Sequence, residues 1–291
     1  MKEIVVVSGK GGTGKTSLSA SFAVLAGKEV VVADCDVDAA DMHLLMQPDF
    51  DKSEDFYAGE LADIDPVACN QCGKCAAVCR FDAISVIDGQ HKVNSLSCEG
   101  CGYCAHVCPT NAITNQDLKV GKLYVSSIKT GSTMVHARLG IAADNSGKLV
   151  AKVKNIAKQI ALEKGKKYMI VDGSPGLGCP VVSSLSGANY VVLVTEPSVS
   201  GLHDLRRVVK LVKKFNIESG CIINKSDLNQ EVSRKIEDFL IEQGISLLSK
   251  LPYNESFTKA MTNGKTIVEY SETQLIDLVS DCWEKVKIRI N

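Results

Sequence analysis

One short loop near the amino terminus constrains the fold more than any other feature of the chain. Residues 9–16 read G-K-G-G-T-G-K-T and directly follow the apolar run at residues 4–7. They match the pattern G-x-x-x-x-G-K-[ST], in which glycines let successive backbone N–H groups turn toward phosphate oxygens and the following helix adds its positive end. A plain tight turn is the alternative, but all four fixed positions match. The sequence therefore predicts a phosphate-binding loop between a strand and a helix.

Two side chains of this loop are expected to act on a nucleotide directly. Lys15 is expected to neutralise the β- and γ-phosphates, and the Thr16 hydroxyl to bind magnesium. The other residues of the loop expected to contact the nucleotide are Gly11, Gly12, Thr13, Gly14 and Ser17.

The composition admits a large folded core and sets aside several classes of protein. A chain of 291 residues with 45% hydrophobic residues suits one large α/β domain or two smaller ones. A net charge of -1 implies no general attraction to nucleic acid or anionic lipid. No apolar run approaches the roughly 18 residues of a membrane span, and the phosphate loop begins too early for a secretion signal. We therefore expect a cytoplasmic protein.

Eight of the twelve cysteines form two copies of one pattern, offset by 29 residues, within residues 59–116. A reducing compartment disfavours disulfides, so these thiols are expected to bind metal. Both copies read C-x2-C-x2-C-x3-C and end in Ala-Ile. The first contains Cys69, Cys72, Cys75 and Cys79, and the second Cys98, Cys101, Cys104 and Cys108.

This spacing lets three thiolates of one loop hold one face of a 4Fe–4S cluster while the fourth reaches the other cluster. The segment resembles a bacterial two-cluster ferredoxin, except that Arg80 stands where proline is usual; Pro109 keeps the proline in the second copy. One cluster is expected on Cys69, Cys72, Cys75 and Cys108, and the other on Cys98, Cys101, Cys104 and Cys79.

Two alternatives stay open for this segment. Four-cysteine zinc sites also use C-x2-C pairs, but they normally separate the pairs by a longer stretch. A purely structural cluster is the stronger alternative, because a small cysteine-rich segment can need metal simply to fold. The presence of two clusters favours electron transfer.

Carboxylates end two of the predicted buried strands, where ligand groups belong in a doubly wound sheet. The strand at 29–33 leads to Asp36. Phosphoryl transfer needs a carboxylate near the γ-phosphate, and we expect Asp36 to supply it. The strand at 168–171 leads to Asp172, expected to hold magnesium through water, and to Gly176, whose N–H is expected to sense the γ-phosphate. Weaker acidic candidates are Asp34, Asp38 and Asp41.

The second lysine of the loop, Lys10, narrows the range of phosphate-loop families that the chain resembles. With K-G-G-T-G-K-T the chain resembles the MinD/ParA superfamily, which includes the nitrogenase iron protein and the Mrp-type carriers. The resemblance implies that Lys10 reaches the partner's nucleotide across a homodimer and that Asp36 orients the attacking water or acts as base. It also implies that Asn224 contacts adenine, helped by backbone near Pro252. Residues 224–227 read N-K-S-D, a guanine-reading motif in GTPases, so GTP is the alternative.

Cys179 follows the strand aspartate at the offset of a cluster ligand in the nitrogenase iron protein. No second cysteine lies between residues 137 and 150, so we expect a small buried residue, with a redox-sensing thiol as the alternative. The predicted helix at 198–215 has a basic face, which we interpret as solvated rather than as a site for DNA or an acidic partner. The end of the chain, 285–290, alternates and is expected to pack on the core rather than bind membrane.

These patterns predict a doubly wound, mostly parallel α/β sheet at 1–58 and 117–291, with a small α+β ferredoxin-like domain inserted at 59–116. Outside the insert the resemblance covers nearly the whole chain. It implies ATP or ADP and Mg²⁺ as ligands, a homodimer, and an ATPase that is slow without its partner. The ferredoxin-like insert implies two clusters that exchange electrons with another protein. Some relatives with this insert belong to an orange-protein complex, so a related MinD-like ATPase is a candidate partner.

Two other functions are weighed against an ATP-gated electron carrier. A positioning or partition ATPase would use the clusters only as scaffold or sensor. An iron–sulfur cluster carrier ranks last, because Mrp-type carriers use a C-x-x-C pair in the nucleotide domain, and the cysteines there, Cys179, Cys221 and Cys282, are isolated in the sequence.

Overall fold

The computed structural model describes residues 1–37, 40–140, 146–270 and 273–290. Its strands are β1 (Lys2–Ser8), β2 (Val30–Asp34), β3 (Lys52–Ile64), β4 (Ile84–Ile87), β5 (Gln90–Val93), β6 (Ile113–Ser127), β7 (Thr133–Leu139), β8 (Tyr168–Asp172), β9 (Tyr190–Thr195), β10 (Ser219–Ile223) and β11 (Ser246–Lys250). Its helices are α1 (Lys15–Ala26), α2 (Met42–Met46), α3 (Lys74–Val78), α4 (Tyr103–His106), α5 (Gly147–Glu163), α6 (Cys179–Leu185), α7 (Val199–Lys214), α8 (Gln230–Gln243), α9 (Ser256–Thr262), α10 (Ile267–Tyr270) and α11 (Thr273–Ile290), with a 3-10 turn at Gly27–Glu29.

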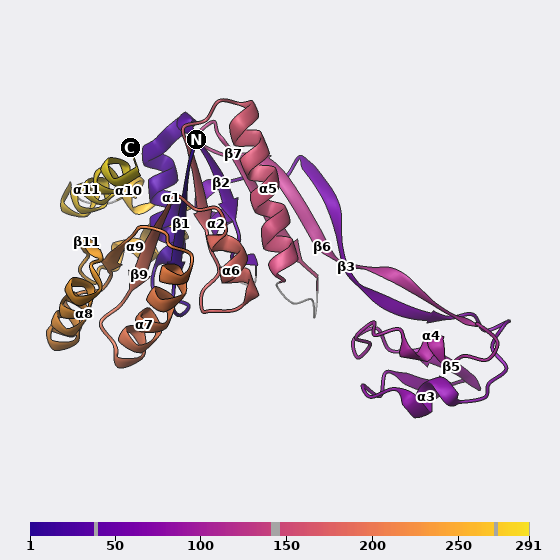
Figure 1. Cartoon of the computed structure of the whole chain (residues 1–291). Helices are drawn as coiled ribbons and strands as arrows, with labels where there is room; N and C mark the ends of the chain where they lie inside the picture. Colours follow the sequence, from indigo (N-terminus) through magenta and orange to yellow (C-terminus); the bar gives the residue numbers. More distant parts are fainter. Residues whose placement is uncertain (38–39, 141–145, 271–272, 291) are drawn as a thin grey trace. The chain divides into compact units, whose positions relative to one another are not determined.

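The described strands form two sheets. The larger has the order β11-β10-β9-β1-β8-β2-β7-β6-β3, and the smaller is the pair β4-β5 (Figure 1). From β11 to β7 each neighbouring pair is parallel. The predicted mostly parallel α/β fold is therefore confirmed.

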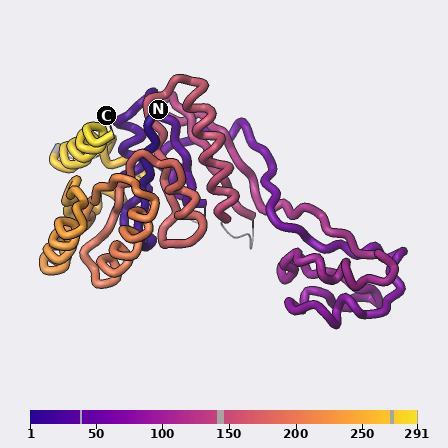
Figure 2. Tube along the Cα trace, viewed as in Figure 1, coloured from indigo at the N-terminus to yellow at the C-terminus, as the bar shows by residue number. Residues whose placement is uncertain are grey.

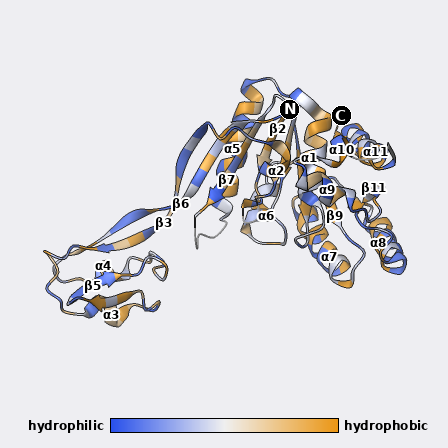
Figure 3. Cartoon of the chain, turned by 180° about the vertical axis from the view of Figure 1, so that it is seen from behind, coloured by the Kyte–Doolittle hydropathy of each residue, from blue (hydrophilic) through white to orange (hydrophobic). Residues whose placement is uncertain are grey.

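The central strands are buried on both faces, which is why they read as unbroken runs of valine and isoleucine. Side chains alternate along β1, so Ile4 and Val6 point to one face and Val5 and Val7 to the other. The first face packs against α1 and α11, where the rings of Phe22 and Trp283 stack with centroids 5.4 Å apart. Helices α5, α6 and α7 also contact this sheet, and Figure 3 shows both hydrophobic and hydrophilic residues on α5 and α7.

The chain divides into two compact units. The first contains Met1–Glu54, Leu123–Leu139 and the described residues from 146 on; the second contains Asp55–Lys122 together with Gly140. In the second unit β4 and β5 pair antiparallel, and α3 contacts α4.

The end of the chain packs on the core, as the sequence predicted. The alternating residues 285–290 continue α11 instead of leaving it, and Val286 and Ile290 are buried in the core of the first unit. Near its end Arg289 Nη1 lies 3.5 Å from Glu218 Oε1, just before β10. Figure 2 shows the start of β1 and the end of α11 near each other. Among the described residues, no helix combines the length and the apolar character that crossing a membrane requires.

A nucleotide pocket and a cysteine-lined cavity

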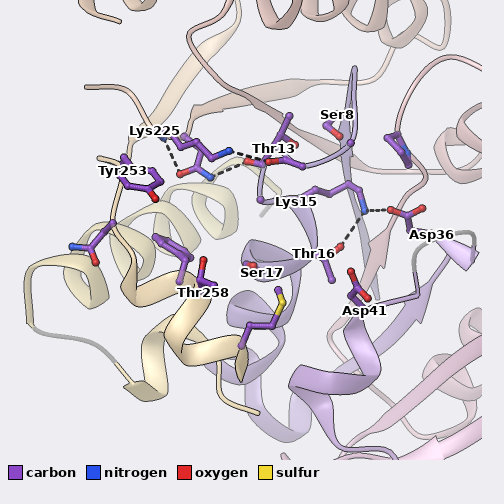
Figure 4. Close-up of a pocket in the computed structure, with 18 of the residues that line it drawn as sticks. Ser8, Thr13, Lys15, Thr16, Ser17, Asp36, Asp41, Lys225, Tyr253 and Thr258 are labelled. Atoms are coloured by element: carbon purple, nitrogen blue, oxygen red, sulfur yellow. Dashed lines mark hydrogen bonds and ion pairs between the residues drawn. The ribbon is translucent and has the colours of Figure 1, made fainter. Parts of the chain in front are cut away.

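A pocket of about 340 Å³ lies in the first unit at the carboxyl end of β1 (Figure 4). The phosphate loop, which joins β1 to the amino terminus of α1, contributes part of its lining. Its lining residues are Ser8, Gly11, Gly12, Thr13, Gly14, Lys15, Thr16, Ser17, Asp36, Asp41, Pro175, Asn224, Lys225, Pro252, Tyr253, Asn254, Phe257, Thr258 and Met261.

Lys15 lies between two carboxylates that come from different strands. Its Nζ is 3.0 Å from Asp36 Oδ2 and 3.0 Å from Asp172 Oδ1, and the lysine side chain is only 5% exposed. Burial lowers the pKa of Lys15, but the charges of Asp172 and Asp36 outweigh it, so the pKa is raised overall. Thr16 donates a hydrogen bond of 2.7 Å to Asp172 Oδ2. The structure thus brings together the residues expected to bind phosphate and magnesium.

Asp34 lies behind this pair and does not line the pocket. It is 1% exposed, and its Oδ1 accepts a hydrogen bond of 3.2 Å from the backbone N–H of Asp36. Burial, followed by the charge of Asp172, raises its pKa well above the usual range. We infer that Asp34 supports the loop that presents Asp36. Asp41 lines the pocket, and Asp38 lies outside the described residues.

Two expected nucleotide contacts are engaged elsewhere in this structure. The N–H of Gly176 donates to Ser8 O at 2.9 Å, and the glycine has φ 90°, which a side chain would strain. Lys10 does not line the pocket. Its Nζ lies 2.5 Å from Glu196 Oε1 in the same chain.

The N-K-S-D segment holds the pocket together. Asn224 donates to Thr13 O at 2.8 Å, and its amide lies so close that a Cβ on Gly14 would be 2.4 Å from it. Asp227 accepts a hydrogen bond of 2.6 Å from the backbone N–H of Tyr253. Both side chains therefore bind protein backbone, and Asn224 also lines the pocket in which we expected it to contact the base.

One wall of the pocket was missed from the sequence. It comes from the residues after Pro252 and from α9, and its apolar members suit a flat aromatic base. No motif marks these residues; their only signal is that they follow Pro252 in the chain. They are Tyr253, Asn254, Phe257, Thr258 and Met261.

A second, small cavity lies in the second unit and gathers cysteines from both copies of the repeat. Cys69, Cys72 and Cys75 line it together with Cys108 and His91. Thus the fourth cysteine of the second copy lies with the first three of the first copy.

Hydrogen bonds surround the sulfur of Cys108. Its Sγ accepts from the backbone N–H of Ala112 at 3.3 Å and lies 3.6 Å from the Thr110 hydroxyl. Burial raises the pKa of Cys108, but the hydrogen bonds from Thr110, Ala112 and Ile113 outweigh it and lower the pKa overall.

For the second expected set of thiols, the structure relates three of the four cysteines to one another. Burial raises the pKa of Cys104, and the nearby thiols of Cys98 and Cys101 raise it further. Three cysteines of the second expected set are therefore neighbours. Among the described residues, no three His, Cys, Asp or Glu side chains lie close enough together to hold one metal ion.

Cys179 corrects one expectation. It begins α6 and is exposed, whereas we expected a small residue buried beneath the loop after β8. Its side chain lies at the first position of a seven-residue helix, where the packed face belongs to Val181, Ser184 and Leu185. The Cys179 thiol is therefore exposed because its position does not belong to the packed face of the helix.

Comparison with known proteins supports nucleotide binding by this chain. Residues 4–267 match the CobQ/CobB/MinD/ParA nucleotide binding domain family. An uncharacterized protein of Methanocaldococcus jannaschii is 33% identical over 98% of this chain and 96% of its own length.

Two solved structures have a similar fold. One is the septum site-determining protein MinD of Pyrococcus horikoshii complexed with Mg-ADP, at 20% identity, TM-score 0.58 and coverage of 98% of this chain and 95% of that one. The other is the MinC:MinD cell division protein complex of Aquifex aeolicus, at 16% identity, TM-score 0.59 and coverage of 99% and 96%. On the family match and the relative that spans almost its full length, this chain is a P-loop ATPase of the CobQ/CobB/MinD/ParA family.

Proposed function

We propose that this ATPase uses Mg-ATP to close a homodimer and couples that switch to electron transfer through two 4Fe–4S clusters. The observation that carries the proposal is the mixed origin of the cysteine-lined cavity. Cys108 lies with Cys69, Cys72 and Cys75 although it is 33 positions after Cys75 in the sequence. An exchange of the fourth cysteine between copies is what a two-cluster ferredoxin requires.

The donor set fits an iron–sulfur cluster. Soft thiolate ligands select Fe–S clusters and zinc, and a 4Fe–4S cluster binds one thiolate on each iron, so it spaces its ligands more widely than a single ion does. Cys69, Cys72, Cys75 and Cys108 would hold one cluster. Cys98, Cys101, Cys104 and Cys79 would hold the other. Each cluster would supply a one-electron carrier.

In the nucleotide half, the chain's own residues bind and position the triphosphate. The backbone of Gly11 to Gly14 would cradle phosphate oxygens, and Lys15 would exchange its carboxylate partners for the β- and γ-phosphates. Thr16 and Asp172, now bonded to each other, would hold Mg²⁺. Asp36, released by Lys15, would orient the attacking water.

The remaining nucleotide roles concern the base and the partner subunit. Ser17, Asn224 and the backbone around Pro252 border the pocket, so we assign them to the nucleoside end, with adenine as the base. Gly176 would leave Ser8 to meet the γ-phosphate, and Lys10 would act on the nucleotide of the second subunit.

We assign these two activities to a nucleotide-binding domain at 1–58 and 117–291 and an inserted domain at 59–116. The compact units support this division, since the second unit runs from Asp55 to Lys122. All eight repeat cysteines lie in that unit, and every residue that lines the nucleotide pocket lies in the first.

An anaerobic preparation tests the proposal. Two clusters require about eight iron atoms per chain and an EPR signal after reduction. We expect Mg-ATP to change the reduction potential or the rate of electron transfer to an acceptor. A Lys15→Ala variant should keep its iron and lose the effect of ATP. Protein that contains no iron would contradict the proposal. So would reduction potentials, electron-transfer rates and partner binding that are all the same with and without ATP.

A second candidate is a positioning ATPase, favoured by the likeness in fold to MinD proteins, one of them solved with MinC. In that case ATP would control binding to a partner protein, and the clusters would only shape the binding surface. Protein whose clusters are present but have lost redox activity would then still bind its partner when ATP is added. Electron transfer that depends on ATP would favour the first proposal.

A further inference from the structure

Glu196 follows β9 directly and binds two lysines, Lys10 of the phosphate loop and Lys225, which follows β10. Its Oε1 lies 2.5 Å from Lys10 Nζ, and its Oε2 lies 2.9 Å from Lys225 Nζ. The three side chains are 18% to 29% exposed, so water screens these pairs only in part. Lys225 also donates to Gly12 O at 3.1 Å, which ties the carboxylate to the phosphate loop.

The start of α7 supplies the rest of the site around Lys10. The ammonium donates to the hydroxyls of Ser198 at 3.2 Å and Ser200 at 3.3 Å. The loop and the helix touch closely here, because a Cβ on Gly9 would lie 2.5 Å from the Cβ of Asp204. Lys10 is thus held on its own chain by one carboxylate and two hydroxyls.

We propose that Glu196 is a positioning residue that holds Lys10 in cis, so that Lys10 reaches the phosphates of a second copy only by leaving this carboxylate. The inference rests on the homodimer in the proposed function. It adds that the phosphates of the second copy's nucleotide must compete with Glu196 for Lys10.

Lys225 makes the exchange feasible. A carboxylate stripped of its only partner would carry a desolvation cost. When Lys10 leaves, Lys225 stays 2.9 Å from Glu196 and continues to balance its charge. Burial raises the pKa of Glu196, but hydrogen bonds from Lys10 and Lys225 outweigh it and lower the pKa, so the carboxylate is ionised at neutral pH.

The size of the effect follows from the kind of contact. A charge-assisted hydrogen bond that is partly screened contributes less than a buried one, and we expect a change of about tenfold in the dimer dissociation constant. The sign is the informative part. Removing a residue that only stabilised the pocket would weaken the dimer, whereas removing a residue that holds Lys10 back strengthens it.

The test is the Glu196→Gln variant with a non-hydrolysable ATP analogue and Mg²⁺, with dimer formation measured by sedimentation velocity over a range of protein concentrations. We expect dimers at about tenfold lower concentration than in the unsubstituted chain. A matched control is Glu237→Gln, which breaks the 2.7 Å pair with Lys250 far from the phosphate loop and should change nothing. Ser200→Ala removes one hydroxyl partner of Lys10 and should shift the dimer in the same direction by less.

A double-mutant cycle with Lys10→Ala separates this mechanism from a general change of surface charge. In the Lys10→Ala background, Glu196→Gln should have no effect on dimer formation. If it strengthens the dimer equally in both backgrounds, or if it weakens the dimer, the positioning role is wrong. An unsubstituted chain that stays monomeric with the analogue would overturn the proposed homodimer and this inference together. If the unsubstituted chain and Glu196→Gln form dimers over the same range of protein concentrations, this inference alone is overturned.

Discussion

The two units differ in what fills their cores. In the first unit aliphatic side chains such as Ile4, Val32 and Val192 are completely buried, and charged groups gather at the carboxyl ends of the strands. In the second unit a small core cluster contains Ala62, Cys75, Ile84 and Ile113, and the partly buried groups around them include further thiols.

This difference has a thermodynamic consequence. A large unit can bury enough apolar surface to fold by itself, whereas a small one often needs metal or cross-links. The first unit can therefore lose a functional side chain and still fold. In the second unit the thiols proposed to bind iron are also part of the core, so function and stability cannot be changed separately.

The sharpest test of this contrast is Cys75→Ser. Metal binding to small thiolate sites supplies on the order of 10 kcal/mol of folding free energy. We expect the variant to lose at least half of its iron and the second unit to become sensitive to protease, while ATP binding in the first unit is retained. Metal analysis, limited proteolysis and nucleotide titration measure the three outcomes. Full iron content in a protease-resistant second unit would remove the distinction between the two cores.

The converse test places a defect in the first unit. Lys154 Nζ lies 2.6 Å from Glu3 Oε1, both side chains are at most 6% exposed, and the ammonium also donates to Ser186 O at 2.8 Å near the end of α6. Lys154→Met leaves the Glu3 charge buried without its partner, which typically costs about 3–5 kcal/mol.

Urea unfolding of the first unit measures that cost, and iron content reports on the second unit, which should be unchanged. Adding Glu3→Gln to Lys154→Met should recover part of the lost stability. A loss below about 1 kcal/mol would show that the pair matters little to this core.

A pH test concerns His136 of β7, which is buried in the first unit, stacks on Tyr124 with centroids 5.1 Å apart and shares a 3.1 Å contact with the Ser126 hydroxyl. Burial, followed by the charges of His43 and Arg138, lowers its pKa from 6.5 to about 4.

The folded state thus favours neutral His136, so its stabilisation is fully present above pH 6.5 and is lost as pH falls to about 4. The loss should be roughly 3 kcal/mol. Denaturant unfolding at several pH values should show this slope, and His136→Gln should flatten it. An equal slope in both proteins would assign the acid sensitivity to other groups.

The smallest expected effect concerns the second unit. Hydrogen bonds to a cluster's sulfur ligands stabilise its more negative, reduced form and so raise its potential. Thr110→Val removes the hydroxyl beside Cys108 Sγ and should lower the potential of that cluster by up to about 59 mV, a tenfold change for one electron.

Thr110→Ser should keep the original potential. Phe81 occupies the equivalent position in the first copy, so Phe81→Thr should raise the potential of the Cys79 cluster. Redox titration followed by EPR distinguishes the two clusters. Identical potentials in Thr110→Val and the unsubstituted chain would show that the hydroxyl does not bond to that sulfur.

Part of the site was accessible from local patterns. The phosphate loop specifies its own conformation through its glycines, and Asp36 and Asp172 follow buried strands that end at one edge of a parallel sheet. Their approach to Lys15 within 3.0 Å follows from that shared edge. The cysteine spacing likewise indicated that Cys108 would lie with Cys69, Cys72 and Cys75.

Other contacts join segments that no local pattern relates. Lys10 and Glu196 are 186 positions apart in the sequence, and nothing in either segment identifies the other. The pocket wall from α9 and the backbone hydrogen bond accepted by Asp227 arise in the same way. The exposure of Cys179 depends on the phase of a short helix, which a few residues do not determine.

The sequence by itself determined the parallel α/β fold, the phosphate loop and the place of Cys108 beside the first cysteine repeat, because each is encoded by residue spacing over a short stretch. Only the tertiary structure decided where Lys10 is held, what closes the base end of the pocket and which side chains stay buried beside the charges. Those outcomes depend on packing between distant segments, where the final position of a side chain is a balance of burial and charge.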